Sequence, residues 1–310
     1  MKGYDIIGDI HGQYAKLTDL LAALGYKAPG GEWRHPEGRQ VIFLGDYIDR
    51  GPEIRRVLHL VRRMCDEGNA LAIMGNHEYN AVCYHTPDGN GSHLRPRRTQ
   101  NRLQHAATLA EFFDSQDEWM DWVAWMKRLP FYLDLGALRV VHAAWHPEAM
   151  AAIGGASLTD DAFLHASAMK GSPEYRALEA LLKGVEVALP KGVVYMDKDG
   201  HERRAIRSRW WSNERAGVTY RSLVFPPALS PPDVEVPREH LESLPGYGAG
   251  EPPVFVGHYW LPADAAAVPQ CDNLACLDYS AAKDGPLTAY RWDGEQVLSA
   301  DRFLRAEQSP

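Results

Sequence analysis

Three short stretches place carboxylate, imidazole and amide side chains within a few residues of one another. They are Gly8-Asp9-Ile10-His11-Gly12, Gly45-Asp46-Tyr47-Ile48-Asp49-Arg50-Gly51 and Gly75-Asn76-His77-Glu78. Their oxygen and imidazole donors, with no thiolate, suit Mn, Fe, Zn and similar divalent cations. Each stretch alone is compatible with an ordinary turn, because Gly, Asp and Asn are common turn residues. Three in succession favour a cation-binding site.

The spacing within these stretches indicates how a cation would be held. Asp9 and His11 are two residues apart, so in an extended segment both point to the same side and can bind one ion. Asp46 has two carboxylate oxygens and can bridge two ions, and Asn76 adds a neutral amide oxygen. Two later histidines could serve a second ion: His142 in RVVHAAW and His258 in VFVGHYW.

The elements around these stretches predict how they come together. The apolar runs YDII, VIFL and LAIM each precede one stretch, and two of them lead into helical patterns over residues 14–24 and 54–64. Such alternation predicts a partly parallel sheet with its functional loops at the carboxyl ends of the strands. Further on, we expect helices near 102–113 and 117–127 whose aromatic residues pack in the core. Six further runs read as strands: FYLDL, LRVVHA, PVFVGH, LACLDY, LTAYRW and QVLSA.

The stretch from about 151 to 253 differs in character from the rest. It combines a helical pattern near 175–189, a turn at 197–200 and a proline-rich piece from 226 to 237. We interpret it as an insertion or cap within a single domain of residues 1–310.

Two basic clusters could line the site. In HERRAIRSRWW, residues 201–211, alternation along a strand would place Arg207 and Arg209 on one face, where one could complete a phosphate clamp. Trp210 or Trp211 could stack on a base or other ring of a substrate. The alternative is a solvated basic edge with the tryptophans packed in the core. Residues 93–98 form a second basic cluster, either in the same groove or in an exposed loop.

Composition excludes several classes of protein. The 310 residues include 45% hydrophobic ones, enough for a large core, while a net charge of −8 argues against general nucleic-acid binding. The four cysteines form no Cys-x-x-Cys pair, so we expect neither a disulfide framework nor a thiolate zinc site. No apolar run fits a signal peptide or a membrane span, so we expect a cytoplasmic protein with no membrane partner.

The ordered motifs resemble a known family. GDIHG, GDYIDRG, GNHE, VVHA and a final GH, in this order, are similar to the phosphoprotein phosphatase branch of the calcineurin-like metallophosphoesterases. The resemblance covers Gly8 to about His146 and about Val254 to Trp292. Within the branch, the chain looks most like bacterial symmetrical diadenosine tetraphosphatases and small bacterial serine/threonine protein phosphatases. The resemblance implies an α/β fold, in which a β-sandwich is flanked by helices in four layers, α/β/β/α.

One part of the chain departs from the tetraphosphatase pattern. The tail LACLDYSAAKDGPLTAYRW is similar overall, but Asp278-Tyr279-Ser280 and Asp284-Gly285 stand where those enzymes usually have Asp-Thr-Gly followed by a pair of glycines. This difference weakens the inference of a nucleotide substrate.

The resemblance also implies roles for individual residues. The first cation would be bound by Asp9, His11 and Asp46. The second would be bound by Asp46, Asn76, His142 and His258. Arg50 would contact phosphate, and His77 would donate a proton with support from Asp49. The implied cofactors are two divalent ions, Mn²⁺ first, with Fe, Zn, Ni or Co as alternatives.

Two classes of function are consistent with these features. The first is a phosphoesterase in which the cations provide a shared hydroxide nucleophile and stabilise the attacking and leaving oxygens. The second is a non-catalytic scaffold, which we disfavour because His77, Asp49 and every ligand are retained. Substrates could be phosphoproteins, nucleotides or small phosphate esters. We favour phosphomonoesterase or serine/threonine protein phosphatase activity; the alternatives are symmetrical bis(5'-nucleosyl)-tetraphosphatase and nucleic-acid end phosphatase activity.

Overall fold

The computed structural model describes residues 3–196, 202–227 and 231–306 and contains two main β-sheets. The first sheet has five strands in the order β13-β12-β1-β2-β3. Its parallel part is β1 (Tyr4–Ile7), β2 (Gln40–Phe43) and β3 (Ala70–Ala72). β12 (Leu287–Trp292) pairs antiparallel with β1, and β13 (Phe303–Ala306) pairs antiparallel with β12. The predicted parallel arrangement of the first three strands is confirmed.

The second sheet has four strands in the order β11-β10-β5-β4. β5 (Arg139–Val141), β10 (Val254–Val256) and β11 (Leu274–Cys276) run parallel. β4 (Tyr132–Asp134) pairs antiparallel with β5. Two strands from the far end of the chain therefore complete a sheet begun by the hairpin of β4 and β5.

Successive apolar residues along these strands point to opposite faces of the sheets, and both faces are buried. Ile6, Ile42, Val140 and Phe255 share one cluster, which lies between the two sheets. The residues that follow them, Ile7, Phe43, Val141 and Val256, belong to the larger cluster formed with the helices. The α/β sandwich flanked by helices is confirmed.

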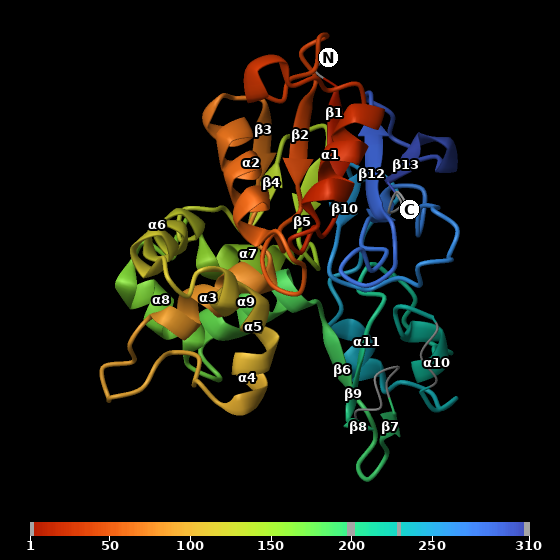
Figure 1. The fold of residues 1–310 in the computed structure, drawn as a ribbon. Coiled ribbons are helices and arrows are strands. Elements are labelled where there is room, and N and C mark those ends of the chain that lie inside the picture. Colours follow the sequence, from red (N-terminus) through yellow and green to blue (C-terminus); the bar gives the residue numbers. More distant parts are fainter. Residues whose placement is uncertain (1–2, 197–201, 228–230, 307–310) are drawn as a thin grey trace.

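Helices on the outside position the loops of the first sheet. α1 (Tyr14–Ala23) packs on β12 and β13, and α2 (Ile54–Asp66) packs on β3 (Figure 1). A short 3₁₀ turn, η1 (Pro29–Gly31), follows α1. α3 (Asn76–His85) begins directly after Gly75, which follows β3, and it packs on α6 (Gln116–Met126). Trp119, Trp122 and Trp125 of α6 are buried in the main core, as the sequence predicts.

The remaining helices lie beyond the ends of the strands. α4 (Thr99–Gln104) and α5 (Ala106–Glu111) replace the single helix expected over 102–113, with His105 at the break between them. α7 (Pro147–Ile153), α8 (Asp161–Ala168) and α9 (Pro173–Lys183) pack on one another and contribute to the main core. The helical pattern expected over 175–189 extends too far: α9 ends at Lys183, and residues 186–188 form a strand.

A smaller lobe follows α9 and has its own apolar cluster (Figure 1). Its two-stranded pairs are β6 (Glu186–Ala188) with β9 (Ala205–Arg207), and β7 (Tyr195–Met196) with β8 (Glu202–Arg203). Its helices are α10 (Tyr220–Leu223) and α11 (Arg238–Glu242). The predicted turn at 197–200 and residues 228–230 of the proline-rich piece lie outside the described residues.

One predicted strand is wrong. QVLSA, residues 296–300, is not a strand; its last residue opens the 3₁₀ turn η2 (Ala300–Arg302), and the strand is β13, which follows it. Ser299 N–H bonds to the Tyr290 hydroxyl instead of to a neighbouring strand. Within the described residues, no helix is both long and apolar enough to cross a membrane.

Candidate metal centre

Backbone hydrogen bonds join the loops that follow four strands. The amides of Ile10 and His11, after β1, both donate to the carbonyl of Asp46, after β2, at 3.1 and 2.8 Å. The amide of Gly257, after β10, donates to the carbonyl of His142, after β5, at 2.9 Å. The amide of His258 then reaches the carboxylate of Asp9 at 3.1 and 3.2 Å. Residues from both sheets therefore meet in one site.

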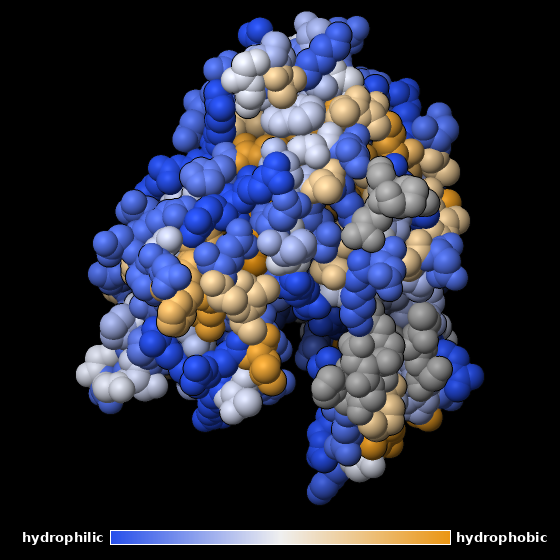
Figure 2. Space-filling model, in the orientation of Figure 1, coloured by the Kyte–Doolittle hydropathy of each residue, from blue (hydrophilic) through white to orange (hydrophobic). Residues whose placement is uncertain are grey.

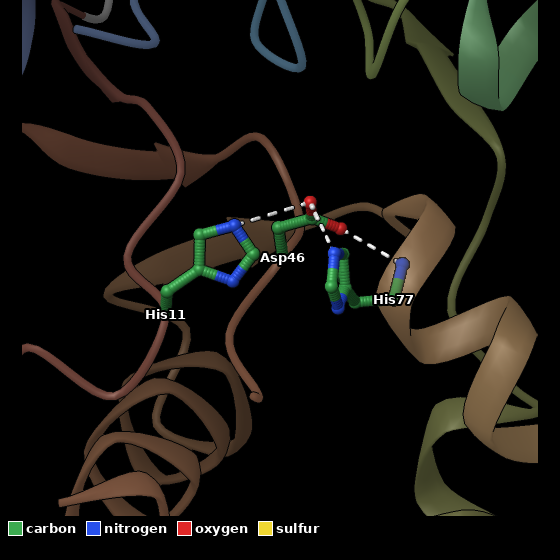
Figure 3. A group of neighbouring side chains, drawn as sticks. All are labelled: His11, Asp46 and His77. Atoms are coloured by element: carbon green, nitrogen blue, oxygen red, sulfur yellow. Dashed lines mark hydrogen bonds and ion pairs between the residues drawn. The ribbon is translucent and has the colours of Figure 1, made fainter. Parts of the chain in front are cut away.

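Asp46 lies at the centre of this site. One of its oxygens, Oδ2, is 3.5 Å from Nε2 of His11, and the other, Oδ1, is 3.5 Å from Nε2 of His142. Two groups of potential ligand atoms, each within 4.8 Å of one another, share this carboxylate: His11, Asp46 and His77, and Asp9, Asp46 and His142. Figure 3 shows His11 and His77 facing Asp46. This geometry fits a bridging carboxylate.

The histidine tautomers leave Nε2 available for a cation. Nδ1 of His11 donates to the carbonyl of Ile48 at 2.8 Å, and Nδ1 of His142 donates to the carbonyl of Leu44 at 2.7 Å. Fixing the proton on Nδ1 in this way leaves a lone pair on Nε2 of each of these two rings. Nδ1 of His258 and Nε2 of His142 both lie near Oδ1 of Asn76, at 2.7 and 3.1 Å.

The chemistry of the buried donors fits divalent cations. Nε2 of His11 and Nε2 of His258 are buried and have no hydrogen-bond partner among the described residues. Burial raises the pKa of Asp9 well above its usual value, and the negative charges of Asp278 and Asp46 raise it further. Burial, together with the neighbouring His77, lowers the pKa of His11 to about 3. Cations bound here would offset the crowded carboxylates and satisfy the orphaned nitrogens.

The backbone at the site is strained. Seven described residues other than glycine have positive φ, and five of them are candidate site residues: His11, Asp46, Asp49, Arg50 and His258. A left-handed conformation costs energy for these residues and persists only where the surroundings enforce it. Gly257 lets the backbone after β10 lie close to the carboxylate of Asp9, because a Cβ at this position would be 2.0 Å from Oδ1 of Asp9.

Glu78 stabilises the loop after β2 by accepting its backbone amides. Its Oε2 accepts the amides of Asp46 and Gly75 at 2.8 and 3.0 Å, and its Oε1 accepts the amide of Tyr47 at 2.8 Å. Glu78 is fully buried. The fourth residue of the GNHE motif therefore shapes the strained loop.

His77 lies beside the candidate cation site, at the start of α3. Its Nδ1 donates to Oδ2 of Asp49 at 2.6 Å, and its Nε2 is 4.0 Å from Oδ2 of Asp46 and 3.4 Å from a guanidinium nitrogen of Arg50. Burial alone would lower the pKa of His77, but the carboxylates of Asp46 and Asp49 outweigh burial and raise it. This placement suits a proton donor.

Arg50 is exposed at the mouth of the site. Its guanidinium carbon stacks 4.1 Å from the ring centroid of Trp260, a residue of the VFVGHYW run that sequence reasoning did not assign. The indole face limits the directions in which the guanidinium can point. Stacking therefore orients the N–H donors of Arg50. Its guanidinium charge stays accessible to a phosphate.

The basic cluster at 201–211 divides between two environments. Arg207 ends β9 and is half-buried, and its charge adds to burial in lowering the pKa of His258. Arg209 lies beyond the strand, is exposed, and has its guanidinium carbon 5.9 Å from the Trp211 ring. Trp210 and Trp211 are buried in the core, which favours the packing alternative over stacking on a substrate.

Arg95 belongs to the basic cluster at 93–98, which was expected either in the groove or in an exposed loop, and it lines a small cavity together with His77 and Asp49. Sequence reasoning missed two residues that contact Asp49. His105 and Thr108 contact Asp49 from the segment around α5. No local signal identifies them, because their proximity to Asp49 depends on how α4 and α5 pack against the strand loops.

Known proteins are similar in sequence to the part of the chain that carries most of this site. The family model described as calcineurin-like phosphoesterase matches residues 4–160. A relative from Halalkalibacterium halodurans named bis(5'-nucleosyl)-tetraphosphatase [asymmetrical] is 45% identical over 74 residues, which cover 24% of this chain and 30% of the relative. This chain therefore matches less than a third of that relative's length.

Two solved structures are also similar. A protein serine/threonine phosphatase from Saccharomyces cerevisiae aligns with 14% identity and a TM-score of 0.48, covering 100% of this chain and 81% of that one. A cold-active protein-tyrosine phosphatase of a Shewanella species aligns with 15% identity and a TM-score of 0.47, covering 99% and 81%. The family model alone spans half of the chain, including the three motif loops and β5 with His142. The chain thus belongs to the calcineurin-like phosphoesterase family.

Proposed function

We propose that this protein is a hydrolase that cleaves phosphate esters at a centre for two divalent cations. The observation that carries the proposal is the shared carboxylate of Asp46, whose two oxygens face different imidazoles, with the pair of His77 and Asp49 beside it. A scaffold that only binds partners would not need a buried imidazole and carboxylate pair next to orphaned ligand nitrogens.

The candidate ligands divide between two positions that share Asp46. Asp9 and His11 would hold one cation with Asp46, and Asn76, His142 and His258 would hold the other. When bound, such a pair activates water near neutral pH and stabilises charge on the attacking and leaving oxygens. The oxygen and imidazole donors suit Mn²⁺, our first choice, and equally Fe, Zn, Ni and Co as alternatives.

The chain's own side chains would bind the substrate and move the proton. Arg50 would hold phosphoryl oxygens with its oriented guanidinium, and Arg207 would approach from the side of His258. His77 would give its Nε2 proton to the departing oxygen, while Asp49 retains the proton on Nδ1.

For the substrate, we propose phosphomonoesters, including phosphoserine or phosphothreonine in proteins. Trp210 and Trp211, the aromatic side chains offered for stacking a base, are buried in the core, which supports this choice. The second candidate is hydrolysis of dinucleoside tetraphosphates, which the name of the Halalkalibacterium relative favours. That name specifies asymmetrical cleavage, whereas the sequence motifs resemble symmetrical enzymes.

One assay separates these candidates. Protein reconstituted with Mn²⁺ is given a phosphopeptide panel and diadenosine tetraphosphate side by side, and the products are resolved by chromatography. We expect phosphate release from the peptides to dominate. Faster release of two ADP would instead establish symmetrical tetraphosphatase activity, and ATP with AMP would establish asymmetrical cleavage. No turnover of any substrate would contradict the proposed hydrolase.

A further inference from the structure

A buried chain of side chains continues behind His77. Oδ2 of Asp49 accepts from Nδ1 of His77 at 2.6 Å, and Oδ1 accepts from Nδ1 of His105 at 2.7 Å and from the hydroxyl of Thr108 at 2.6 Å. The Asp49 amide donates to the same hydroxyl at 3.0 Å. Asp49, His105 and Thr108 are each at most 5% exposed. Both carboxylate oxygens are therefore engaged, one by the candidate acid and the other by two residues from a different segment.

A second contact limits how the ring of His105 can turn. Its Nδ1 donates to Oδ1 of Asp49, and its Nε2 lies 3.4 Å from Nε2 of His85. The indole N–H of Trp119 donates to that same nitrogen of His85 at 2.9 Å. A turn of the His105 ring would therefore break its bond to Asp49.

The backbone explains why Asp49 needs such support. Asp49 and Arg50 have φ values of 66° and 69°, so the loop that carries them is strained and its side chains are not fixed by regular secondary structure. His105 lies at the break between α4 and α5, and Thr108 lies one turn further along α5. These two side chains connect the strained loop to a helical segment.

We propose that His105 is a positioning residue for the phosphoester reaction: by holding Oδ1 of Asp49, it directs Oδ2 to His77 and so aims the Nε2 proton of His77 at the leaving oxygen. This inference rests on the proposed function. His105 contacts neither substrate nor the candidate ligands, and Thr108 assists it through the same oxygen. Replacing His105 should therefore lower kcat most for substrates whose leaving group needs a proton to depart.

The test compares two esters that differ in this need. Phenolate requires a proton to depart, whereas 4-nitrophenolate is a much weaker base and departs more readily without one. We would measure kcat and KM with Mn²⁺ for phenyl phosphate and 4-nitrophenyl phosphate. The variants are His105→Phe, which fills the space but cannot donate, and His105→Asn, whose amide can still donate to Asp49. His59→Asn, at an exposed position on α2, is the matched control.

We expect His105→Phe to lower kcat on phenyl phosphate about tenfold more than on 4-nitrophenyl phosphate, with KM unchanged, and His105→Asn to restore most of the difference. His59→Asn should match the wild type. Equal losses on both esters, or no rescue by asparagine, would overturn the proposal. If His105→Phe does not fold, Thr108→Val removes a second donor to the same oxygen, and equal losses on both esters in that variant would likewise overturn the proposal.

The proposed function is tested separately by the wild type. Wild-type turnover of both esters supports the hydrolase whatever the variants do. Nitrogen-15 NMR of the ring of His105 does not depend on activity: a proton on Nδ1 is expected, and a ring lacking the Nδ1 proton would contradict the bond to Asp49.

Discussion

At the scale of single residues, the site depends most on side chains that have two partners each. Asp46 faces His11 with one oxygen and His142 with the other, and Asp49 divides its oxygens between His77 and His105. A carboxylate shared in this way couples its two neighbours, so removing it should affect both. The first of the three following predictions uses that coupling.

Asp46→Asn should weaken binding at both cation positions. The amide keeps one oxygen but replaces the other with a nitrogen that cannot ligate, and it removes the negative charge. Metal content measured after gel filtration should fall from two ions per chain toward none. A variant that retains two tightly bound ions would contradict a bridging role.

His77→Ala should abolish most turnover while leaving metal content nearly intact. Loss of a general acid costs about 10²- to 10⁴-fold in rate. The measurement is kcat together with metal content of the same preparation. His77 also lies within ligand distance of His11 and Asp46, so loss of a cation in this variant would reassign His77 as a ligand.

Arg207→Ala and Arg209→Ala should differ, although both arginines come from the same basic run. Arg207 lies near His258, whereas Arg209 lies beside Trp211. Loss of a charged hydrogen bond to phosphate corresponds to about tenfold or more in kcat/KM, so we expect that loss for Arg207→Ala and little change for Arg209→Ala. Equal effects of the two changes would remove Arg207 from the substrate clamp.

At the scale of elements, hydrogen bonds join the strand loops to one another. Glu78, on α3, accepts amides from the loop after β2, and His258, after β10, bonds to Asp9, after β1. Asp46 and Asp49 both have positive φ, and their amides donate to Glu78 and Thr108 respectively. The geometry of each loop is therefore a property of the neighbouring elements as well as of its own sequence.

Glu78→Gln tests the support of the loop. Glutamine keeps one acceptor oxygen, so at least one amide now held by Glu78 would face an NH₂ group, and a buried unsatisfied group costs about 1–3 kcal/mol. We expect a lower free energy of unfolding in urea denaturation. Glu67→Gln is the control, because Glu67 is exposed and pairs with Arg63 where solvent screens the charges. Equal stability of the two variants would contradict the supporting role.

The sequence predicted the strand loops because their residues are adjacent in the chain. Apolar runs before Asp9, Asp46 and Asn76 specify strands, and parallel strands bring their carboxyl ends to one edge. His105 and Thr108 could not be found in this way, because helix packing brings them to Asp49 across 56 and 59 residues. QVLSA was misassigned because an alternating pattern does not reveal whether a partner strand is within reach.

At the scale of the whole molecule, we propose a single domain of residues 1–310 with an insertion at about 151–253. The two parts of that stretch behave differently: α7, α8 and α9 pack into the main core, whereas residues 187–244 contribute a cluster of their own. Trp210 attaches the smaller lobe to the core through an indole N–H bond to the Ala143 carbonyl, next to His142. Figure 2 shows a hollow between the helical side and this lobe, with hydrophilic residues inside it.

Removal of metal should lower the thermal stability of the whole protein. Ligands that bind only the folded state stabilise it by mass action, and here they would also offset buried carboxylates. Chelation followed by calorimetry should show a lower Tm and no turnover, and Mn²⁺ should restore both. In Asp46→Asn, Mn²⁺ should change Tm much less. A wild-type Tm that does not respond to Mn²⁺ would contradict the candidate centre.

The bond between Asp9 and His258 spans 249 residues and has a consequence for biosynthesis. The first ligand leaves the ribosome early, but the last emerges only after the smaller lobe, and β12 must still be made before β1 gains its antiparallel neighbour. A nascent chain therefore exposes an incomplete set of ligands for most of its translation. Loading with two cations should be one of the last events of maturation, so a chain truncated before residue 254 would be synthesised, but without the ability to keep both ions.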